Sequence, residues 1–531
     1  MSWQHTTSIY QIYPRSFYDS NGDGIGDLQG IIQKLDYIQQ LGFETIWISP
    51  FYKSPQDDFG YDIADYYTIS PEYGTLQDAE MLIHEVHKRD MKIVFDMVMN
   101  HTSNQHHWFL ESKKNKTNPK ADWYIWRDQP NNWKSIVGPK AWHYCEERKQ
   151  YYFASFLPFQ PDLNYRCPEV KNAMFDVCRF WLSKGVDGFR LDIFNCILKD
   201  KDFKNNPFSL WHAIPSEDYP GGNFQIRKYS LNLPENFMLA KELRQVVDEF
   251  PDRLLLGEVF GKHELKKKYL GENNDGLHLI FLFDIVMFTF TANFFRKKIL
   301  EFEQQYPSPY MPTVVFSNHD QLRSIKRIGN KLEKAKLLAL LQFTMRAVPT
   351  VYNGEEIGMM DGNIAIKDGK DPVAKVYSWV PQFIADRLPV GINRDNCRTP
   401  MQWNNTEKNA GFSTADTTWL PVNTTTENRN VAQQQADKNS LLYTFKKLIF
   451  LRKKWRALHR GDIEIIYTGN KNILAYTRTF EEEKLLVMMN FSNSKISNKI
   501  NQPIKEIVFS INNISTFDGV LLPYDGVILK I

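Results

Sequence analysis

The sequence has few cysteines, and their arrangement excludes two common structural frameworks. The five cysteines are an odd number, are scattered along the chain and form no Cys-X-X-Cys pair; they are Cys145, Cys167, Cys178, Cys196 and Cys397. A disulfide framework uses an even set at short spacings, and a zinc site uses closely spaced pairs. We therefore expect neither in this protein.

The sequence also lacks the signals of export, of membrane insertion and of nucleic-acid binding. Residues Met1 to His5 do not show the basic-then-apolar pattern of a signal peptide, and no run approaches the ~20 apolar residues of a membrane span. The 65 basic and 62 acidic residues leave a net charge of +3, which is too small to create a field for nucleic acid or a membrane surface. These absences predict a soluble cytoplasmic protein, a monomer or a weakly associating homo-oligomer, whose partner is a small molecule.

The chain is rich in apolar runs that alternate with helical patterns. With 531 residues it is long enough for two or three domains. Eight runs read as buried strands: Ile9–Tyr13, Thr45–Ser49, Lys92–Val98, Gly188–Phe194, Arg253–Val259, Leu279–Phe283, Thr313–Ser317 and Pro349–Tyr352. Eight strand–helix repeats favour an α/β fold, a closed (β/α)₈ TIM barrel. The alternative is an open doubly wound sheet, which is disfavoured because no glycine-rich phosphate loop follows an early strand.

Two stretches depart from a minimal barrel. Residues 102–171 show no clear helical period and many Trp, Asn, Pro and Lys residues, which predicts a subdomain inserted after strand 3. Short alternating apolar segments close the chain and predict a C-terminal antiparallel β domain. We therefore assign residues 1–101 and 172–456 to the barrel, 102–171 to the inserted subdomain, and 457–531 to a C-terminal β-sandwich domain.

Polar residues cluster where the predicted strands end. The fourth run closes in Gly188-Phe189-Arg190-Leu191-Asp192, where Arg190 and Asp192 point to the same face of a strand. The third run ends in Asp96, Asn100 and His101, the fifth in Glu258, and the seventh in Asn318-His319-Asp320. In a barrel the carboxyl ends of different strands form one site, so these groups are expected to meet.

These segments carry a family resemblance. Asp96-Met97-Val98-Met99-Asn100-His101, Gly188 to Asp192, Gly257-Glu258 and Asn318-His319-Asp320 resemble the four motifs of the α-amylase superfamily of glycoside hydrolases. Gln160-Pro161-Asp162-Leu163-Asn164, Gly354-Glu355-Glu356-Ile357-Gly358 and Arg398-Thr399-Pro400-Met401-Gln402-Trp403 are similar to segments of its oligo-1,6-glucosidase branch. The resemblance covers Ile9 to about Trp403.

The resemblance implies roles for nine residues. Asp192 matches the nucleophile that forms a covalent glucosyl intermediate, Glu258 the general acid/base, and Asp320 the group that binds the sugar's 2- and 3-hydroxyls. Asp62 and Arg398 match a pair that clasps the non-reducing glucose. The remaining sugar-binding residues implied in this way are His101, Phe156, Arg190 and His319.

The residues themselves agree with this chemistry. Glycoside cleavage needs one ionised carboxylate and one protonated carboxyl group. Asp192 lies beside Arg190, which favours ionisation, whereas Glu258 lies among Leu256, Val259 and Phe260, an apolar context that raises a carboxyl pKa.

A loop near the start of the chain has oxygen ligands at calcium-loop spacing. Asp19, Asn21, Asp23 and Asp27 occupy positions 1, 3, 5 and 9, Gly24 stands at position 6, and Ile25 offers a carbonyl at position 7. Position 12 is Gly30 rather than the bidentate Glu of an EF-hand, and an Asp/Gly turn is the alternative. Relatives in the oligo-1,6-glucosidase branch carry a similar loop, which implies structural Ca²⁺, with Mg²⁺ as the other candidate.

The residue after the nucleophile bears on linkage preference. In α-1,6-acting relatives a branched residue follows the Asp, so Ile193 implies exo-action on α-1,6 linkages such as those of isomaltose and panose. Phe194 and Leu322 depart from that branch, which leaves α-1,4 (maltase), sucrose-cleaving and trehalose-6-phosphate-cleaving activities as alternatives. Sucrose isomerases carry an Arg-rich segment with two Arg–Asp steps where this chain has residues 321–327, so hydrolysis is favoured. A non-catalytic transporter heavy chain is the remote alternative, disfavoured by the three acids and the missing anchor.

Overall fold

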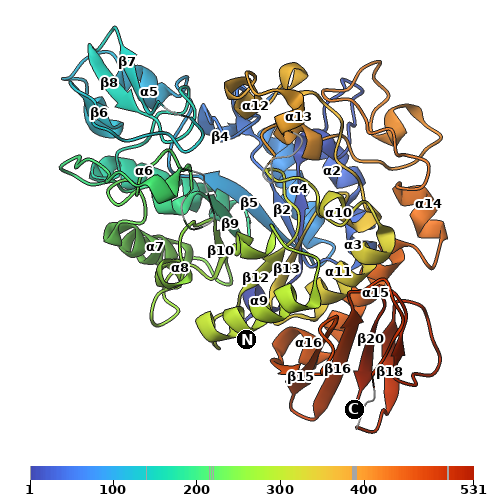
Figure 1. Ribbon diagram of the computed structural model, residues 1–531. Helices are drawn as coiled ribbons and strands as arrows, with labels where there is room; N and C mark the ends of the chain where they lie inside the picture. The colour runs from blue at the N-terminus through green and yellow to red at the C-terminus, as the bar shows by residue number, and fades with distance from the viewer. Residues whose placement is uncertain are drawn as a thin grey trace.

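A computed structural model describes residues 2–531 except 139, 214, 215, 217, 219, 386–390 and 499–501. Eight parallel strands form one curved sheet at its centre (Figure 1). They are β1 (Ile9–Ile12), β2 (Thr45–Ile48), β5 (Lys92–Val98), β9 (Gly188–Asp192), β10 (Leu254–Gly257), β11 (Leu279–Ile280), β12 (Thr313–Val315) and β13 (Val348–Tyr352). The sequence prediction of a TIM barrel is therefore confirmed.

The sheet closes between β11 and β12 through a side chain. The hydrogen-bonded order runs β11-β10-β9-β5-β2-β1-β13-β12. At the remaining seam, the hydroxyl of Thr313 accepts the N–H of Leu282 at 3.1 Å and donates to the carbonyl of Ile280 at 2.9 Å. Because β11 is only two residues long, the side chain of Thr313 makes the hydrogen bonds that backbone groups make between the other neighbouring strands.

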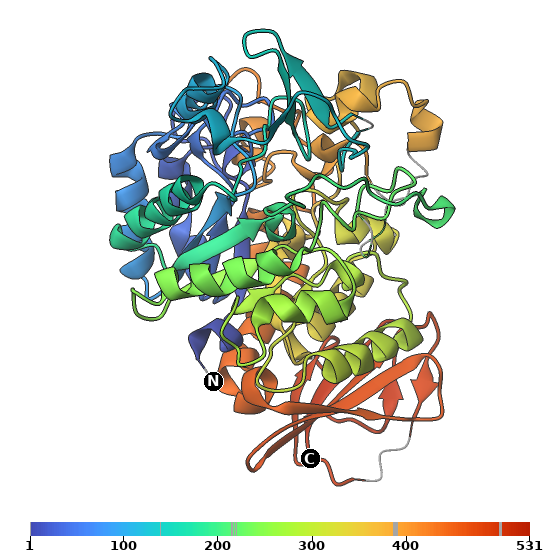
Figure 2. The same cartoon turned by 90° about the vertical axis from the view of Figure 1, so that its left-hand side faces the viewer.

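A ring of helices covers the outside of the barrel (Figure 2). These are α2 (Leu28–Gln33) with α3 (Leu35–Leu41), α4 (Leu76–His87), α6 (Pro168–Ser183), α7 (Pro234–Val247), α8 (His263–Leu270), α9 (Ala292–Gln305), α11 (Leu332–Thr344) and α15 (Leu441–Lys454). Their starts follow local chemistry: Thr75 and Asp78 form a capping box at α4, and proline occupies the first turn of α6 and α7.

Several predicted boundaries moved. The fourth strand ends at Asp192 rather than Phe194 because Ile193 turns into the left-handed region, with φ 39° and ψ 49°. The apolar residues Leu28, Ile31, Leu35 and Ile38 have helical spacing in the sequence. In the structure they lie on two helices, α2 and α3, which are separated at Lys34, whose N–H bonds the carbonyl of Ile31 in a tighter turn.

The segment between β5 and α6 forms the inserted unit, which projects at the upper left of Figure 1. It contains α5 (His107–Ser112) and an antiparallel sheet in the order β6-β8-β7, namely β6 (Trp126–Arg127), β8 (Gln150–Phe153) and β7 (Trp142–Cys145). Indole and phenyl rings of Trp133, Trp142 and Phe153 pack together in its core. A further hairpin, β3 (Tyr52–Lys53) with β4 (Asp65–Ile69), lies between β2 and α4.

The C-terminal domain is antiparallel, as predicted. Its five-stranded sheet has the order β14-β15-β16-β20-β18 and a separate ribbon pairs β17 with β19. The strands are β14 (Asp462–Ile466), β15 (Ile473–Phe480), β16 (Glu483–Asn490), β17 (Ile496–Ser497), β18 (Glu506–Ser510), β19 (Val520–Leu521) and β20 (Gly526–Lys530). It follows α15 and α16 (Arg456–Arg460) and lies below the barrel in Figure 1.

Short helices occur elsewhere in the chain: α1 (Trp3–Thr6), α10 (Ser324–Arg327), α12 (Pro372–Val376), α13 (Gln382–Ala385) and α14 (Val431–Ala436). All five cysteines are free thiols. Within the described part of the chain, no helix combines the length and the apolar composition that crossing a bilayer requires.

Candidate active site

The carboxyl ends of β5, β9 and β10 bring three acidic side chains onto one guanidinium. Arg190 Nη1 donates to Asp192 Oδ1 at 2.8 Å and to Asp96 Oδ1 at 2.9 Å, and Arg190 Nη2 donates to Glu258. Residues Arg190 and Asp192 share a face of β9, and the parallel register places Asp96 directly beside Arg190. The guanidinium therefore holds two of the three predicted catalytic acids, Asp192 and Glu258, next to each other.

Asp192 and Glu258 are both nearly buried, with 7 % and 5 % of their surfaces exposed. Burial raises the pKa of Glu258 well above its ordinary value, and Asp192, Asp320 and Asp96 add to the rise while Arg190 opposes it. Glu258 therefore keeps its proton to a higher pH than an ordinary glutamate does. Asp96 is fully buried, and burial raises its pKa to about 7 against the effect of Arg190.

Asp320, the third predicted acid, follows β12 and is held by a separate set of partners. Arg398 Nη2 donates to its Oδ1 at 2.9 Å, Arg394 Nη1 to the same oxygen at 3.2 Å, and His319 Nε2 lies 3.2 Å from Oδ2. Burial opposes ionisation, but His319, Arg394 and Arg398 together lower the pKa of Asp320 below its ordinary value. Its side chain keeps 30 % of its surface exposed, so this carboxylate is ionised and reachable by a ligand.

A chain of hydrogen bonds connects Asp320 with Asp96, the buried acid that contacts Arg190. Gln11 Nε2 lies 2.7 Å from His319 Nδ1, and His319 Nε2 lies 2.6 Å from the hydroxyl of Tyr61, which donates to Asp96 at 3.1 Å. Burial lowers the pKa of His319 to about 3, so the ring is neutral. With the Gln11 amide donating to Nδ1, the ring proton is assigned to Nε2, facing Tyr61 and Asp320.

His101 and Phe156, both predicted in the sugar-binding shell, lie side by side. Their rings are 5.5 Å apart, and His101 Nε2 is 3.1 Å from the carbonyl of Tyr61. Burial lowers the pKa of His101. Phe156 comes from the inserted unit, whereas His101 follows β5, so this pair joins the two parts of the molecule.

Asp62 and Arg398, which are predicted to clasp a glucose between them, have different hydrogen-bond partners in the structure. Asp62 accepts the hydroxyl of Ser54 at 2.9 Å and the N–H groups of Asp57 and Asp58 at 2.9 and 3.0 Å, and burial together with Asp58 raises its pKa to about 7. Arg398 instead bonds the carbonyl of His319 at 2.7 Å and the Asp320 carboxylate. The clasp around a bound glucose therefore stays a prediction.

Arg394, a residue that the sequence interpretation missed, joins Asp58 to Asp320. Its guanidinium contacts Asp58 at 2.6 Å, Asp371 at 2.7 Å and Asp320 at 3.2 Å. Arg394 stands four residues before Arg398, in a stretch without helical or strand period. That closeness to Arg398 was the one signal that could have identified it.

The predicted calcium loop forms a tight turn on the amino side of α2. Asp19 accepts the N–H groups of Asn21, Gly22 and Gly24 at 2.8–3.1 Å, and Asp27 caps α2 by accepting the N–H of Gly30 at 2.6 Å. Gly24 has φ +90°, and a Cβ there would lie 2.3 Å from the carbonyl oxygen of Thr417, so glycine is required.

The chemistry of this loop suits a hard cation, since its donors are carboxylate, amide and carbonyl oxygens. Among the described residues, however, no three acidic, histidine or cysteine side chains converge as a metal-binding group. The metal therefore stays a prediction.

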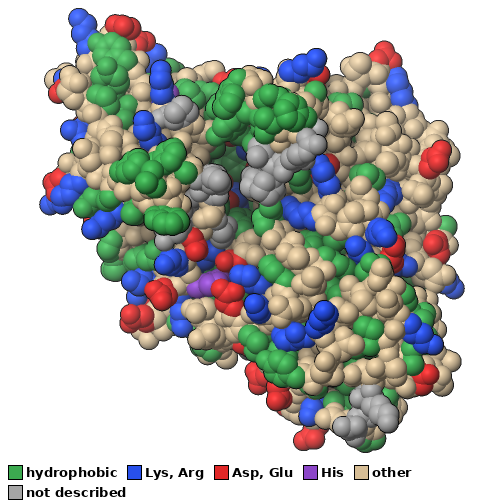
Figure 3. Space-filling model, in the orientation of Figure 1, with side chains coloured by type: hydrophobic (Ala, Val, Ile, Leu, Met, Phe, Trp, Pro, Cys, Tyr) green, Lys and Arg blue, Asp and Glu red, His purple; other side chains and the backbone are tan. Residues whose placement is uncertain are grey.

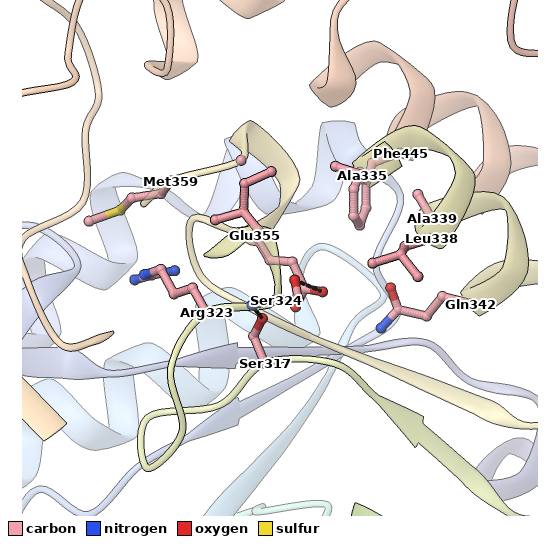
Figure 4. A pocket seen from close by; sticks show the side chains of 12 residues that line it. Ser317, Arg323, Ser324, Ala335, Leu338, Ala339, Gln342, Glu355, Met359 and Phe445 are labelled. Carbon is pink, nitrogen blue, oxygen red and sulfur yellow. Dashed lines mark hydrogen bonds between the residues drawn. The ribbon is translucent and has the colours of Figure 1, made fainter. Parts of the chain in front are cut away.

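A small cavity lies between the segment that follows β12, α11 and α15 (Figure 4). Its volume is about 10 Å³, and Arg323, Gln342 and Glu355 are among its lining residues. Burial raises the pKa of Glu355 to about 8. The cavity has room for about one water molecule, and a sugar cannot enter it.

Comparison with known proteins agrees with this geometry. The model of the alpha-amylase family, described as the alpha amylase catalytic domain, matches residues 11–461. An oligo-1,6-glucosidase of Parageobacillus thermoglucosidasius is 36 % identical over 100 % of this chain and 99 % of its own, and a glucan 1,6-alpha-glucosidase of Streptococcus pneumoniae is 36 % identical over 99 % and 98 %. Among solved structures, an isomaltulose synthase mutant from Erwinia rhapontici in complex with sucrose has a TM-score of 0.90 at 34 % identity, covering 100 % of this chain and 99 % of that one.

Proposed function

The chain belongs to the alpha-amylase family of glycoside hydrolases, and from this premise we propose that it is a retaining, exo-acting α-glucosidase of short α-glucosides that prefers α-1,6 linkages. One observation carries the proposal: a single guanidinium, Arg190, hydrogen-bonds both Asp192 and Glu258. Retaining glycosidases need their two carboxyl groups close together, ~5–5.5 Å apart, and the shared guanidinium keeps these two acids next to each other.

The two acids share Arg190 but take different roles. Asp192, the residue that matches the family's nucleophile, attacks the anomeric carbon and forms the covalent glucosyl intermediate. Glu258, whose pKa is raised by burial, first donates its proton to the departing glycosidic oxygen. It then takes a proton from the water that attacks the intermediate.

Asp320 is the group that holds the sugar. Its ionised carboxylate accepts hydrogen bonds from the two ring hydroxyls of the reacting glucose, while Arg394 and Arg398 keep it oriented. In this proposal His101, Phe156 and His319 surround the same glucose ring. Arg190 holds Asp192 and Glu258. Asp62 is proposed to bind the non-reducing glucose from the β2 side.

Ile193 supports the preference for α-1,6 linkages. It directly follows the nucleophile and is a β-branched residue in the left-handed region (φ 39°), a conformation such residues rarely adopt. We propose that the branched side chain of Ile193, next in the chain to Asp192, borders the leaving-group side of the site. The names of the relatives with α-1,6 activity support the same assignment.

Sucrose isomerisation is the second candidate, because solved isomaltulose synthases share the fold at TM-scores of 0.90–0.91. Hydrolysis remains favoured by residues 321–327, which lack two Arg–Asp steps. We further propose that Ca²⁺, or Mg²⁺ in its place, binds the loop through Asp19, Asn21, Asp23, Asp27 and the carbonyl of Ile25. This role is structural.

The test is an assay of the purified protein against an aryl α-glucoside, isomaltose, maltose, sucrose and trehalose-6-phosphate, with products resolved by chromatography and NMR. We expect α-glucose as the first product, and faster turnover of isomaltose than of maltose. Asp192→Asn and Glu258→Gln should each abolish hydrolysis. Substantial activity in either variant, or β-glucose as the first product, would refute the mechanism.

A further inference from the structure

The segment between β9 and α7 exposes several aromatic rings. Trp211 has 95 % and Phe208 71 % of its surface exposed, and the rings of Phe208 and Phe224 stack at 6.0 Å and 11°. Residues 207–213 and 220–226 are held together by backbone bonds, among them Ser209 N–H to the carbonyl of Phe224 at 2.8 Å. The loop that carries the rings is therefore fixed by its own hydrogen bonds. Exposed apolar rings on such a loop often mark a binding surface.

A second exposed group follows α12. Trp379 has 77 % of its surface exposed, and Phe383 and Ile384 on α13 are also exposed. Figure 3 shows hydrophobic side chains gathered over α12 and α13 and, across a hollow, over the loop that precedes α7. The two groups are named here the distal loop (residues 207–213 and 220–226) and the α13 patch (residues 379–385).

The distal loop is connected to the candidate site by direct contacts. Arg227 follows the loop, and its Nε donates to the carbonyl of Pro220 in the loop at 2.8 Å. Its terminal nitrogens donate to the carbonyls of Lys134 at 2.6 Å and Ser135 at 2.7 Å, and the hydroxyl of Ser135 donates to the carbonyl of Phe156 at 2.6 Å. Phe156 in turn lies against His101. These contacts lead from Pro220 in the distal loop, through Arg227 and Ser135, to Phe156 in the sugar-binding shell.

The α13 patch follows α12, which is connected to the candidate site from the other side. Asp371 caps α12 and bonds Arg394, which reaches Asp320. The inserted unit lies near this segment as well, since a Cβ added to Gly138 would be 3.9 Å from Val376 on α12. Residues 134–138 are therefore bordered by the distal loop on one side and by α12 on the other.

We propose that the distal loop and the α13 patch bind the outer glucose units of an oligosaccharide whose terminal unit occupies the site, so that the enzyme favours chains of several units over disaccharides. The inference rests on the proposed function. Flat exposed rings offer apolar faces against which the C–H face of a sugar packs. A protein partner that covered both patches would close the hollow between them to substrate, which disfavours that occupant.

The chain-length dependence of hydrolysis tests the proposal. For the wild type, kcat/KM should rise from isomaltose to isomaltohexaose, or along the maltose series if that linkage is preferred. In Trp211→Ala and Trp379→Ala, the ratio of kcat/KM for the hexaose to that for an aryl α-glucoside should fall five- to tenfold. Phe450→Ala is the matched control, because Phe450 is 63 % exposed on α15, away from both patches, and its ratio should equal that of the wild type.

A binding measurement keeps the proposal independent of catalysis. In native gels containing dextran or soluble starch, Asp192→Asn should be retarded, and Asp192→Asn combined with Trp211→Ala should be retarded less. A flat chain-length profile, or equal retardation of both variants, would overturn the inference even if the aryl glucoside is hydrolysed. A change in oligomeric mass in Trp211→Ala without a change in retardation would also overturn it, by assigning the rings to a protein interface. Absence of aryl glucoside hydrolysis in the wild type would count against the proposed function instead.

Discussion

Removal of the Arg394 guanidinium is the sharpest test of how the site is held. Arg394 joins Asp58 and Asp371, whose side chains are 8 % and 0 % exposed, to Asp320. In Arg394→Met, two nearly buried carboxylates lose their cation, and Asp320 keeps only Arg398 and His319. The variant therefore combines a cost to folding with a cost to catalysis, and the two are separable.

The folding cost follows from the buried charges. Removing one partner of a buried ion pair costs about 3–5 kcal/mol. Unfolding entropy near 60 °C is about 2.1 cal/mol/K per residue, or about 1.1 kcal/mol/K for 531 residues. We expect Tm to fall by about 3–5 °C, measured by calorimetry. Arg394→Met combined with Asp371→Asn should recover part of this loss because one uncompensated charge is gone.

The catalytic cost follows from Asp320. A hydrogen bond to a charged group contributes about 1.5–3 kcal/mol, and each 1.36 kcal/mol in the barrier is tenfold in rate. We expect kcat/KM for an aryl α-glucoside to fall about tenfold to a hundredfold, with Arg394→Lys in between, and the double variant should not recover it. A kcat/KM within twofold of the wild type together with a Tm change below about 1 °C would refute the bridging role.

Three further predictions concern other parts of the molecule. Because burial raises the pKa of Glu258, kcat/KM should fall as pH rises through a value well above the ordinary 4.5; a profile that declines already near pH 4.5 would contradict this assignment of the acid. Ile193→Ala should raise turnover of maltose relative to isomaltose, since the branched side chain beside Asp192 is lost, and an unchanged ratio would refute that use of Ile193. Removal of divalent cations with a chelator should lower Tm, with recovery on adding Ca²⁺, and an unchanged Tm together with no bound calcium by elemental analysis would remove the metal proposal.

The interpretation of the sequence succeeded where local pattern and topology are sufficient. Arg190 and Asp192 share a face because strand side chains alternate, and parallel strands bring their carboxyl ends to one edge. Those two rules, applied to apolar runs, predict the barrel and the meeting of Asp192 with Glu258. They cannot predict where Ile193 leaves the strand, because that depends on a backbone conformation unusual for its residue type.

Other features required the tertiary structure. Arg394 and Asp58 are 336 positions apart, and no periodicity in residues 358–439 indicates which guanidinium reaches Asp320. Trp211 and Trp379 are unremarkable in sequence, and only the folded chain brings both to the surface beside the same inserted segment. The sequence determined the strands and the acids at their ends, because neighbouring residues and hydrophobic burial suffice for those. Only the folded barrel decided which loops, far apart in the sequence, lie next to one another around the site. Their contacts arise from long-range packing and not from any local preference.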